Sequence, residues 1–334
     1  MMIKSDATGK PHDRMAAYLS DDMAAVSALI RERMASKHAP RIPEVTAHLV
    51  EAGGKRLRPM LTLAAARMCG YDGPYHVHLA ATVEFIHTAT LLHDDVVDGS
   101  DLRRGKAAAN IIYGNPATVL VGDFLFSRSF ELMTEDGSLK VLKILSGASA
   151  IIAEGEVDQL TAQRKIDTSE ERYLHIIRAK TAALFAAASR IAAVVAECSD
   201  EQEQALDEYG RNLGVAFQLV DDALDYDSNA AAMGKDRGDD FREGKMTLPV
   251  ILAYARGSEE EREFWKAAIG GFKTSDADLD HAIELIDRHH AVDDTKARAR
   301  HFAQRAIDAL SIFPDSSARQ AMTQAALFAV ARGY

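Results

Sequence analysis

Apolar residues recur at intervals of three and four positions along most of the chain, which is the spacing of one buried face of an α-helix. The pattern is clearest over residues 139–157, 169–195 and 201–226, where alanine is abundant and alternating β-branched residues are scarce. No proline occurs between Pro116 and Pro249, and helix interiors exclude proline. The pattern therefore predicts an all-α protein, a single large bundle of at least about ten helices.

Local signals mark where some of these helices begin and end. Pro116 suits the first turn of a helix, and Ser169 before two glutamates indicates an N-cap followed by acids in the first turn. Residues 257–280 are predicted to form a helix hairpin with an exposed connection, and no strand is predicted. Because no linker composition divides the chain, residues 1–334 are predicted to form one domain, with a less ordered stretch over residues 1–12.

The composition narrows the class of protein. With 334 residues, 47% hydrophobic and 27% charged, the chain resembles a soluble globular protein with a sizeable core. Its net charge of −11 argues against nucleic-acid binding, for which a basic surface is expected. Cys69 and Cys198 lack C-x-x-C spacing, which disfavours structural zinc and disulfides and suits a reducing compartment. Since no signal peptide or membrane span is evident, a cytoplasmic location is predicted.

The main candidate chemistry lies in two aspartate clusters, DDVVD at residues 94–98 and DDALD at residues 221–225. Both have the form D-D-x-x-D, so on a helix the outer aspartates stack on one face. Two like charges about 4 Å apart cost roughly 1 kcal/mol in water and roughly 4 kcal/mol at a surface-like dielectric. Because this repulsion occurs in both clusters, the sequence indicates that they bind hard divalent cations such as Mg²⁺. Mg²⁺ usually takes its remaining ligands from water and substrate phosphates.

Basic side chains flank both clusters. GGKRLRP at residues 53–59 places three cations in a turn opened by glycines, LRRGK at residues 102–106 follows the first cluster, and Lys235, Arg237 and Lys245 follow the second. Arginine can hold phosphate oxygens with two parallel hydrogen bonds. Each stretch alone is more often a solvated loop or plain charge compensation. The order of acid cluster and then basic loop occurs twice, however, which favours two diphosphate sites.

Polar residues also interrupt apolar helical stretches near the clusters. His87 lies about two helical turns before Asp94, and Gln218 lies about one turn before Asp221, each on the same face as its aspartate. A Lys-Thr pair at residues 180–181 breaks a third apolar stretch. A satisfied core histidine, or a lysine whose stem packs along apolar surface, explains such residues without a function. From the pattern alone, both interpretations stay open.

Four stretches together resemble one known family. GGKRLRP, FIHTATLLHDDVVDGSDLRRG, GVAFQLVDDALDYD and GKDRGDDFREGKMTLP occur in this order between about residue 50 and residue 250. They are similar to the motifs of the trans-isoprenyl diphosphate synthases, or polyprenyl synthetases. The resemblance implies the isoprenoid synthase type I fold, in which helices surround a central cavity. It also implies a prenyltransferase that condenses isopentenyl diphosphate head-to-tail with an allylic diphosphate.

The resemblance implies a role for each aspartate. The family's Mg²⁺ ligands match Asp94, Asp98, Asp221 and Asp225, supported by Asp95 and Asp222. The family implies three Mg²⁺ ions per active site, with Mn²⁺ as an alternative. The metals and nearby cations, Lys180 among them, stabilise the departing pyrophosphate. The double bond of isopentenyl diphosphate then attacks the allylic carbocation, and pyrophosphate takes the proton that is lost.

The resemblance also assigns two diphosphate sites. The isopentenyl diphosphate site would comprise Lys55, Arg58, His87 and Arg104. The allylic diphosphate site would comprise Arg103, Lys180, Thr181, Gln218, Lys235 and Lys245. Most of these residues lie in the basic loops or interrupt the apolar helices described above.

Product length in the family depends on the side chains beneath the first cluster. Ala89 and Thr90 lie five and four positions before Asp94 and point down the same helical face, where short-chain members carry bulky aromatics. Small side chains leave a tunnel open, and burial of one isoprene unit stabilises by about 4 kcal/mol. We therefore expect products of about forty to fifty carbons, as for octaprenyl and decaprenyl diphosphate synthases. Candidates for the tunnel floor are Phe126, Phe130 and Met133, with ordinary core packing as the alternative.

Further expectations and alternatives follow from the resemblance. Family members are homodimers, and the apolar stretch over residues 117–133 is a candidate interface. A long-chain product indicates a quinone side chain, as in ubiquinone biosynthesis, and loose contact with a membrane surface. A class I terpene cyclase would lack the second D-D-x-x-D, and a non-catalytic partner subunit would tend to lose aspartates. A short-chain farnesyl or geranylgeranyl diphosphate synthase is disfavoured by Ala89 and Thr90.

Overall fold

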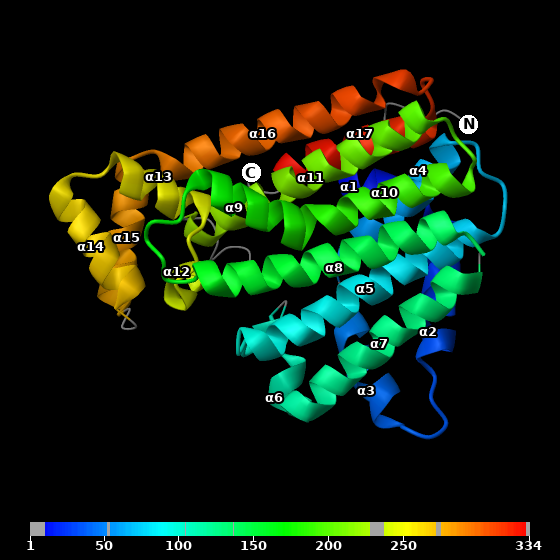
Figure 1. Cartoon of the computed structure of the whole chain (residues 1–334), viewed down its shortest axis with the longest axis horizontal. Coiled ribbons are helices and arrows are strands. Elements are labelled where there is room, and N and C mark those ends of the chain that lie inside the picture. Colours follow the sequence, from blue (N-terminus) through cyan, green and yellow to red (C-terminus); the bar gives the residue numbers. More distant parts are fainter. Residues whose placement is uncertain are drawn as a thin grey trace. The chain divides into compact units, whose positions relative to one another are not determined.

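The computed structural model of the chain describes residues 11–51, 54–103, 105–135, 137–227, 237–271 and 275–331. These residues are mostly helical, so the predicted all-α fold is confirmed (Figure 1). The elements are α1 (Pro11–Tyr18), α2 (Ser20–Met34), α3 (Arg41–Glu51), α4 (Leu57–Met68), α5 (Tyr75–Val97), β1 (Leu102–Arg103), β2 (Lys106–Ala107), α6 (Ala109–Tyr113), α7 (Asn115–Glu135), α8 (Leu139–Ala162), α9 (Glu170–Ile177), a π-helical turn η1 (Arg178–Ala182), α10 (Ala183–Val195), α11 (Asp200–Tyr226), α12 (Asp239–Glu243), α13 (Leu248–Arg256), α14 (Glu259–Gly270), α15 (Asp276–Arg288), α16 (Ala291–Ala309), a 3₁₀ turn η3 (Leu310–Ile312) and α17 (Ser317–Ala331). Among the described helices, none has the length and apolar character needed to cross a membrane.

The chain divides into two compact units, and each is described by itself. The first unit comprises Met1–Ser149, Leu184–Gly210 and Ile307–Phe328, and the second comprises Ala150–Ala183, Arg211–Ala306 and Ala329–Tyr334. The aspartate cluster at residues 94–98 belongs to the first unit, and the cluster at residues 221–225 belongs to the second.

The first unit is built around α5. This helix packs against α2, α4 and α7, and α5 and α7 run side by side in Figure 1. Ala64 and Ala65 on α4 and Ala80 and Ala81 on α5 are fully buried, and small side chains of this kind allow helices to pack closely. Helices α3 and α6 contact α7, and Figure 1 shows the three helices together. The central helix of this unit therefore carries the first aspartate cluster on a rigid support.

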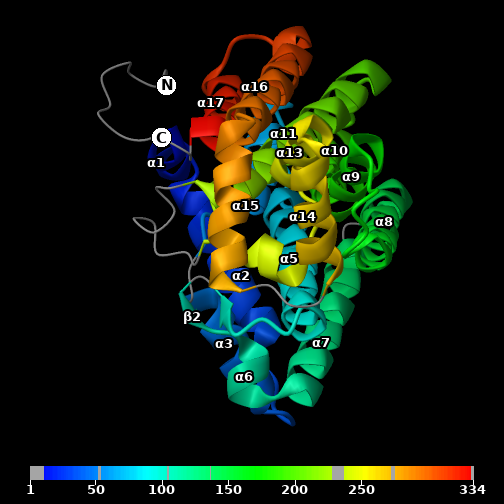
Figure 2. The ribbon, with the colours of Figure 1, turned by 90° about the vertical axis from the view of Figure 1, so that its left-hand side faces the viewer.

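The second unit has an apolar core anchored by Trp265 on α14. This side chain is fully buried, and its ring meets Phe264 and Phe241 edge to face at centroid distances of 5.4 and 6.2 Å. Leu285 and Ile286 on α15 belong to the same core. Helices α14 and α15 lie side by side (Figure 2), so the helix hairpin predicted over residues 257–280 is confirmed, with its second helix continuing to Arg288.

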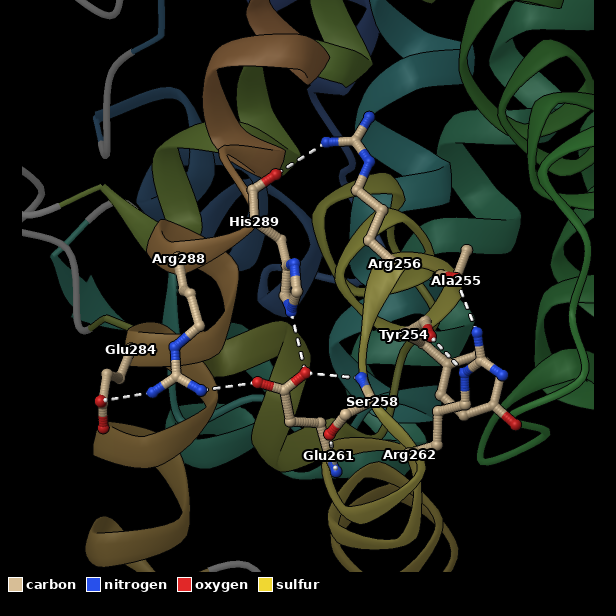
Figure 3. A network of polar contacts seen from close by, with 9 residues as sticks. All are labelled: Tyr254, Ala255, Arg256, Ser258, Glu261, Arg262, Glu284, Arg288 and His289. Carbon is tan, nitrogen blue, oxygen red and sulfur yellow. Dashed lines mark hydrogen bonds and ion pairs between the residues drawn. The ribbon is translucent and has the colours of Figure 1, made fainter.

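A polar network ties the start of α14 to the end of α15 (Figure 3). The Glu261 carboxylate accepts hydrogen bonds from the Ser258 N–H at 2.8 Å, from Arg288 Nη1 at 2.6 Å and from His289 Nε2 at 3.0 Å. Arg256 donates to the His289 carbonyl at 2.7 Å. The Ser258 N–H, and next the His289 ring, lower the pKa of Glu261 to about 2. The hairpin is thus held by charge-assisted hydrogen bonds in addition to its apolar contacts.

Helix starts follow the predicted signals, whereas one short hairpin was missed. Ser169 caps α9 by accepting the Arg172 N–H at 3.2 Å, and Pro116 lies in the first turn of α7. The prediction of no strand was wrong for β1 and β2, which pair antiparallel beyond the first aspartate cluster. Gly105 makes this tight turn with a φ of +76°, a conformation that glycine adopts easily. Strands of two residues are too short for a period of two to reveal them.

Candidate active site

The first aspartate cluster lies at the C-terminal end of α5. The helix ends at Val97, and Asp98 is the C-cap, with its N–H bonded to the Asp94 carbonyl at 2.8 Å. Asp95 is fully buried, whereas Asp94 and Asp98 are part-exposed. The spacing thus leaves the two outer carboxylates accessible and turns the middle one inward. Carboxylates at a helix C-terminus oppose the helix dipole, so this end of α5 favours a cation.

Arg103 on β1 holds the buried carboxylate of the first cluster. Its Nε donates to Asp95 Oδ1 at 2.7 Å, and its Nη2 donates to the same oxygen. Asn110 on α6 donates to the Asp95 carbonyl at 3.0 Å and to the Ser100 carbonyl at 3.1 Å. The short hairpin and α6 therefore close over the end of α5, and Arg103 lies directly beside the cluster.

The Asp95 carboxyl is only partly satisfied, because Arg103 reaches just one of its two oxygens. Burial raises its pKa, and the charge of Arg103 opposes that rise. Within the described residues, Asp95 Oδ2 has no hydrogen-bond partner. A buried carboxylate oxygen without a partner is costly. This end of α5 thus has the surplus of negative charge that a divalent cation would neutralise.

The basic turn before α4 brings two predicted residues into contact. Arg58 Nη1 lies 3.1 Å from His87 Nε2 on α5, and the guanidinium stacks 4.3 Å from the Phe185 ring centroid. Because a guanidinium can only donate, His87 Nε2 is the acceptor and the ring proton lies on Nδ1. Lys55 Nζ lies 4.5 Å from the Phe328 ring centroid. Arg58 and His87 thus form one local site, with Lys55 in the turn beside it.

The second cluster repeats the arrangement near the C-terminal end of α11. Asp221 and Asp225 are part-exposed, and Asp222 is buried. Asp225 accepts the backbone N–H groups of Asp239 and Asp240 at 3.2 and 3.1 Å. The start of α12 therefore lies against the cluster and brings further acids close.

These acids raise one another's pKa. Burial, and next the charge of Asp240, raise the pKa of Asp222 to about 8 and that of Asp225 to about 8. In the described residues, no three His, Cys, Asp or Glu side chains are arranged to hold a metal ion by themselves. Mg²⁺ sites usually combine one or two carboxylates with water and substrate phosphates. The excess of carboxylates fits a cation that is held together with its substrate.

The Lys-Thr pair lies in a π-helical turn, η1, between α9 and α10. Lys180 Nζ forms an ion pair with Glu156 Oε1 at 2.8 Å. Thr181 Oγ1 donates to Gln218 Oε1 on α11 at 2.8 Å. Wide turns of this type interrupt α-helices frequently at functional sites. Three of the predicted diphosphate residues, Lys180, Thr181 and Gln218, are therefore brought together in the second unit.

Two glycines make room for the π-turn. A Cβ on Gly155 of α8 would lie 2.8 Å from the Lys180 N atom and from Ala179 Cβ. A Cβ on Gly214 of α11 would lie 2.5 Å from Ala182 Cα. Both distances are shorter than side chains tolerate. The backbones of α8 and α11 thus approach η1 too closely for any residue other than glycine at these positions.

Of the other predicted site residues, one contacts neighbours that are close in sequence, and two are not described by the structure. Lys245 forms an ion pair with Glu243, and its N–H donates to the Asp240 carbonyl at 2.8 Å. Arg104 and Lys235, which were assigned to the isopentenyl and allylic diphosphate sites, lie outside the described residues.

The proposed chain-length residues lie on α5 and α7, which pack together in the first unit. Ala89 is fully buried, and the part-exposed Thr90 donates its hydroxyl to the His87 carbonyl at 2.8 Å. On α7, Met133 is buried, whereas Phe130 is 38% exposed and meets the part-exposed Phe126 edge to face at 5.3 Å. Of the three candidates for a tunnel floor, Met133 is therefore the most deeply buried.

Sequence reasoning missed two residues that contact the predicted site. Tyr173 donates its hydroxyl to Asp222 at 2.5 Å, and Glu156 pairs with Lys180. Tyr173 has the spacing of an ordinary apolar position, and Glu156 that of an ordinary surface charge. Neither carries a sequence signal, because its partner lies on another helix.

The comparisons with known proteins agree with this geometry. The profile of the polyprenyl synthetase family matches residues 39–286. The octaprenyl diphosphate synthase of Escherichia coli (strain K12) is 46% identical over 313 residues, which cover 94% of this chain and 96% of that protein. The crystal structure of a decaprenyl diphosphate synthase from Rhodobacter capsulatus is 57% identical, with a TM-score of 0.93 over 97% of this chain and 99% of the other. A polyprenyl synthase from Caulobacter crescentus CB15, complexed with calcium and isoprenyl diphosphate, is 53% identical, with a TM-score of 0.93 over 97% and 98%.

The chain therefore belongs to the polyprenyl synthetase family. Within that family its activity is of the long-chain, all-trans class, and it is a prenyltransferase. The predicted fold, family and type of reaction are confirmed.

Proposed function

We propose that Asp94, Asp98, Asp221 and Asp225 bind Mg²⁺ together with the allylic diphosphate, with Mn²⁺ as an alternative and three ions per site. The observation that supports this most strongly is the crowding of acids at the second cluster, where burial and Asp240 raise the pKa of Asp225 to about 8. A divalent cation would replace this repulsion by attraction. When bound, it would neutralise the charge that develops on the departing diphosphate.

In this proposal the polar residues of the second unit hold the allylic diphosphate. Lys180 in η1 and Lys245 after α12 supply positive charge, Gln218 supplies the second N–H of its side-chain amide, and Thr181 holds that amide in place through its hydroxyl. Lys235 would add a further cation from the segment that follows the second cluster. Because these side chains act on the leaving group, their main effect is on the departure of pyrophosphate.

The basic turn before α4 would hold isopentenyl diphosphate. Lys55 and Arg58 supply charge, His87 supplies its Nδ1–H, and Arg104 adds a cation from the hairpin turn. Arg103, which holds Asp95, is the cation assigned to the allylic diphosphate on the first unit. The chain's own role at this site is to fix the nucleophile and to hold its diphosphate, and no side-chain base is required, since pyrophosphate takes the proton.

The growing chain would extend beneath the first cluster along α5. Ala89 is small, and Thr90 already satisfies its hydroxyl within the helix, so its methyl group is suited to an apolar tunnel. We propose products of about forty to fifty carbons, used as a quinone side chain, because each added isoprene unit contributes about 4 kcal/mol of burial. Phe126, Phe130 and Met133 remain the candidates for the floor. Unchanged product length in Phe130→Ala would remove Phe130.

We further propose that the chain works as a homodimer, with residues 1–334 acting as one functional domain and with loose membrane contact when the product leaves. The outer side of α7 and the adjoining α6 support this, because Leu120 is 66% exposed and Ile111 is 55% exposed. Exposed apolar side chains in a group commonly mark an interface. Leu120→Glu is expected to yield monomers in analytical ultracentrifugation, whereas Ile312→Glu, at a separate exposed apolar position, is expected to leave the dimer intact.

The decisive experiment measures product length and metal dependence together. The purified protein is incubated with farnesyl diphosphate and labelled isopentenyl diphosphate, with Mg²⁺ or with chelator. We expect elongation to about forty carbons or more only with the metal, at rates reduced about a hundredfold or more in Asp94→Ala and in Asp225→Ala. Full activity in both variants would contradict the metal assignment, and products that stop at fifteen to twenty carbons would contradict the proposed length.

A further inference from the structure

Tyr173 on α9 places its hydroxyl against the second aspartate cluster from inside the protein. The side chain is only 3% exposed, and its ring belongs to the apolar core with Ile177 and Leu219. The hydroxyl donates to Asp222 Oδ2 at 2.5 Å. A buried tyrosine hydroxyl needs a partner, but its partner here is the inward-facing acid of a functional motif.

The same carboxylate starts a chain of hydrogen bonds towards the proposed diphosphate residues. Gln218 Nε2 donates to Asp222 Oδ1 at 2.7 Å, and Thr181 Oγ1 donates to Gln218 Oε1 at 2.8 Å. The carboxyl oxygens of Asp222 accept both bonds, one from the Tyr173 hydroxyl and one from the Gln218 amide nitrogen. The amide nitrogen of Gln218 must face Asp222, its oxygen must face η1, and the Thr181 hydroxyl must therefore donate.

The π-turn makes this arrangement possible. Tyr173 and Thr181 lie on one continuous helical segment, α9 and η1, and both reach α11. Eight residues of a regular α-helix would rotate the second side chain about 80° away from the first. One extra residue in a π-turn removes about 100° of that rotation and leaves a difference of about 20°. The segment is therefore clamped to α11 at two points, at Asp222 and at Gln218.

We propose that Tyr173 is a positioning residue for the allylic diphosphate site, acting through Asp222 to fix the orientation of Gln218 and Thr181. The inference rests on the proposed placement of that diphosphate at Gln218 and Thr181. Tyr173 itself is buried in the core, so its hydroxyl acts through Asp222. Its loss should disturb the allylic site and leave the isopentenyl diphosphate residues of the first unit unaffected.

The test compares Tyr173→Phe with Tyr209→Phe. Tyr209 is also fully buried and also donates its hydroxyl to an acceptor, the Met322 carbonyl at 2.8 Å, so both variants lose one buried hydrogen bond and keep the ring. We expect Tyr173→Phe to lower kcat, or to raise the KM for farnesyl diphosphate, by about tenfold, as for other residues that orient metal-site ligands. The KM for isopentenyl diphosphate should change less than twofold, and Tyr209→Phe should keep wild-type kinetics.

A metal-free measurement separates positioning from stability. In the chelated protein, the side-chain amide resonances of Gln218, assigned by their loss in Gln218→Leu, should shift in Tyr173→Phe and stay in place in Tyr209→Phe. Combining Tyr173→Phe with Gln218→Leu should cost no more activity than Gln218→Leu alone, because both act through one hydrogen-bonded chain. Unfolding midpoints of the two tyrosine variants should be similar.

Three results would overturn the proposal. The first is equal kinetics of Tyr173→Phe and Tyr209→Phe, and the second is a shared rise in the KM values of both substrates. The third is full additivity with Gln218→Leu. Lys180→Ala distinguishes a failure of the proposed diphosphate site from a failure of the positioning role. If Lys180→Ala loses activity while Tyr173→Phe does not, only the positioning role fails. If Lys180→Ala and Gln218→Leu both keep full activity, the diphosphate site is misplaced and the positioning role fails with it.

Discussion

Lys180 on the π-turn and Glu156 on α8 form an ion pair with 2.8 Å between Nζ and Oε1, and their side chains are only 22% and 21% exposed. Lys180, which is proposed to bind the diphosphate, thus already has a counterion within the protein. In the proposed site, an incoming diphosphate would have to share or displace the Glu156 carboxylate to reach the ammonium group of Lys180. The pair therefore keeps Lys180 in place before the substrate binds and weakens its attraction for phosphate.

Glu156→Gln is accordingly expected to strengthen the binding of pyrophosphate. Removal of a part-buried counterion should increase the affinity by roughly 0.5–1 kcal/mol, or about two- to fivefold. Isothermal titration calorimetry with inorganic pyrophosphate and Mg²⁺ measures this directly. Glu154→Gln, the same charge change at an exposed position of the same helix, should leave the affinity unchanged. Weaker binding in Glu156→Gln would mean that the carboxylate orients Lys180 more than it competes for it.

The second prediction concerns the glycine that accommodates the π-turn. Gly155→Ala should lower the free energy of unfolding by about 1–3 kcal/mol through overpacking, because its Cβ would meet the Lys180 backbone at 2.8 Å. Activity should fall as well, since Lys180 and Thr181 are displaced. Gly147→Ala is the matched control on the same helix, with no atom within 4 Å of the added Cβ. It should stabilise the protein by about 0.5–1 kcal/mol through helix propensity.

Chemical denaturation and steady-state kinetics of both glycine variants provide the measurement. If Gly155→Ala were as stable and active as Gly147→Ala, the close approach of α8 to η1 would contribute neither to stability nor to activity.

Much of the fold could be predicted because it depends on local pattern. Apolar residues at helical spacing gave the long helices, and Ser169 and Pro116 marked true helix starts. The π-turn at residues 178–182 could not be predicted, because a polar interruption at residues 180–181 does not reveal that the helix contains one extra residue in that turn. Its conformation depends on glycines of α8 and α11 that lie close only after folding. The hairpin of β1 and β2 was missed because two-residue strands show no alternation.

Candidate site residues could be named from the sequence where a charged side chain interrupts an apolar pattern. The aspartate clusters and Lys180 stood out as polar groups placed against local preference. Tyr173 did not, because a tyrosine beside Ile176 and Ile177 has the appearance of one more buried apolar residue. Its proposed positioning role depends on a hydrogen bond to a carboxylate 49 residues later in the chain, and a single sequence contains no such pairing.

The third prediction is an acid sensitivity of the hairpin of α14 and α15. Hydrogen bonds from Ser258, and next from His289, lower the folded-state pKa of Glu261 from 4.5 to about 2. A group whose pKa is depressed on folding contributes stability above its unfolded pKa and loses it as pH falls through the folded value. Glu261→Gln should therefore lower the unfolding midpoint at pH 7, and the difference from wild type should shrink progressively below about pH 4.5.

Scanning calorimetry between pH 7 and pH 3 checks this dependence. Glu259→Gln, in the first turn of the same helix and exposed, should show a small difference without that pH profile. A deficit in Glu261→Gln that stayed constant down to pH 3 would assign its effect to packing and not to ionisation.

The last prediction tests whether a tunnel lies beneath the first aspartate cluster. Ala80 and Ala89 lie on the same helix and are both fully buried, so burial alone predicts equal cost when either becomes phenylalanine. In a close-packed core the added ring should destabilise the protein by about 1–3 kcal/mol or more, and this is expected for Ala80→Phe. In Ala89→Phe the ring should enter the space meant for the growing prenyl chain, so the unfolding midpoint should stay close to that of the wild type. Products should then shorten to about fifteen to twenty carbons, since the ring excludes the isoprene units whose burial favours elongation.

Product chromatography and thermal unfolding of both variants test whether the tunnel lies beside Ala89. Equal destabilisation of both variants, or unchanged products in a stable Ala89→Phe, would place the tunnel elsewhere.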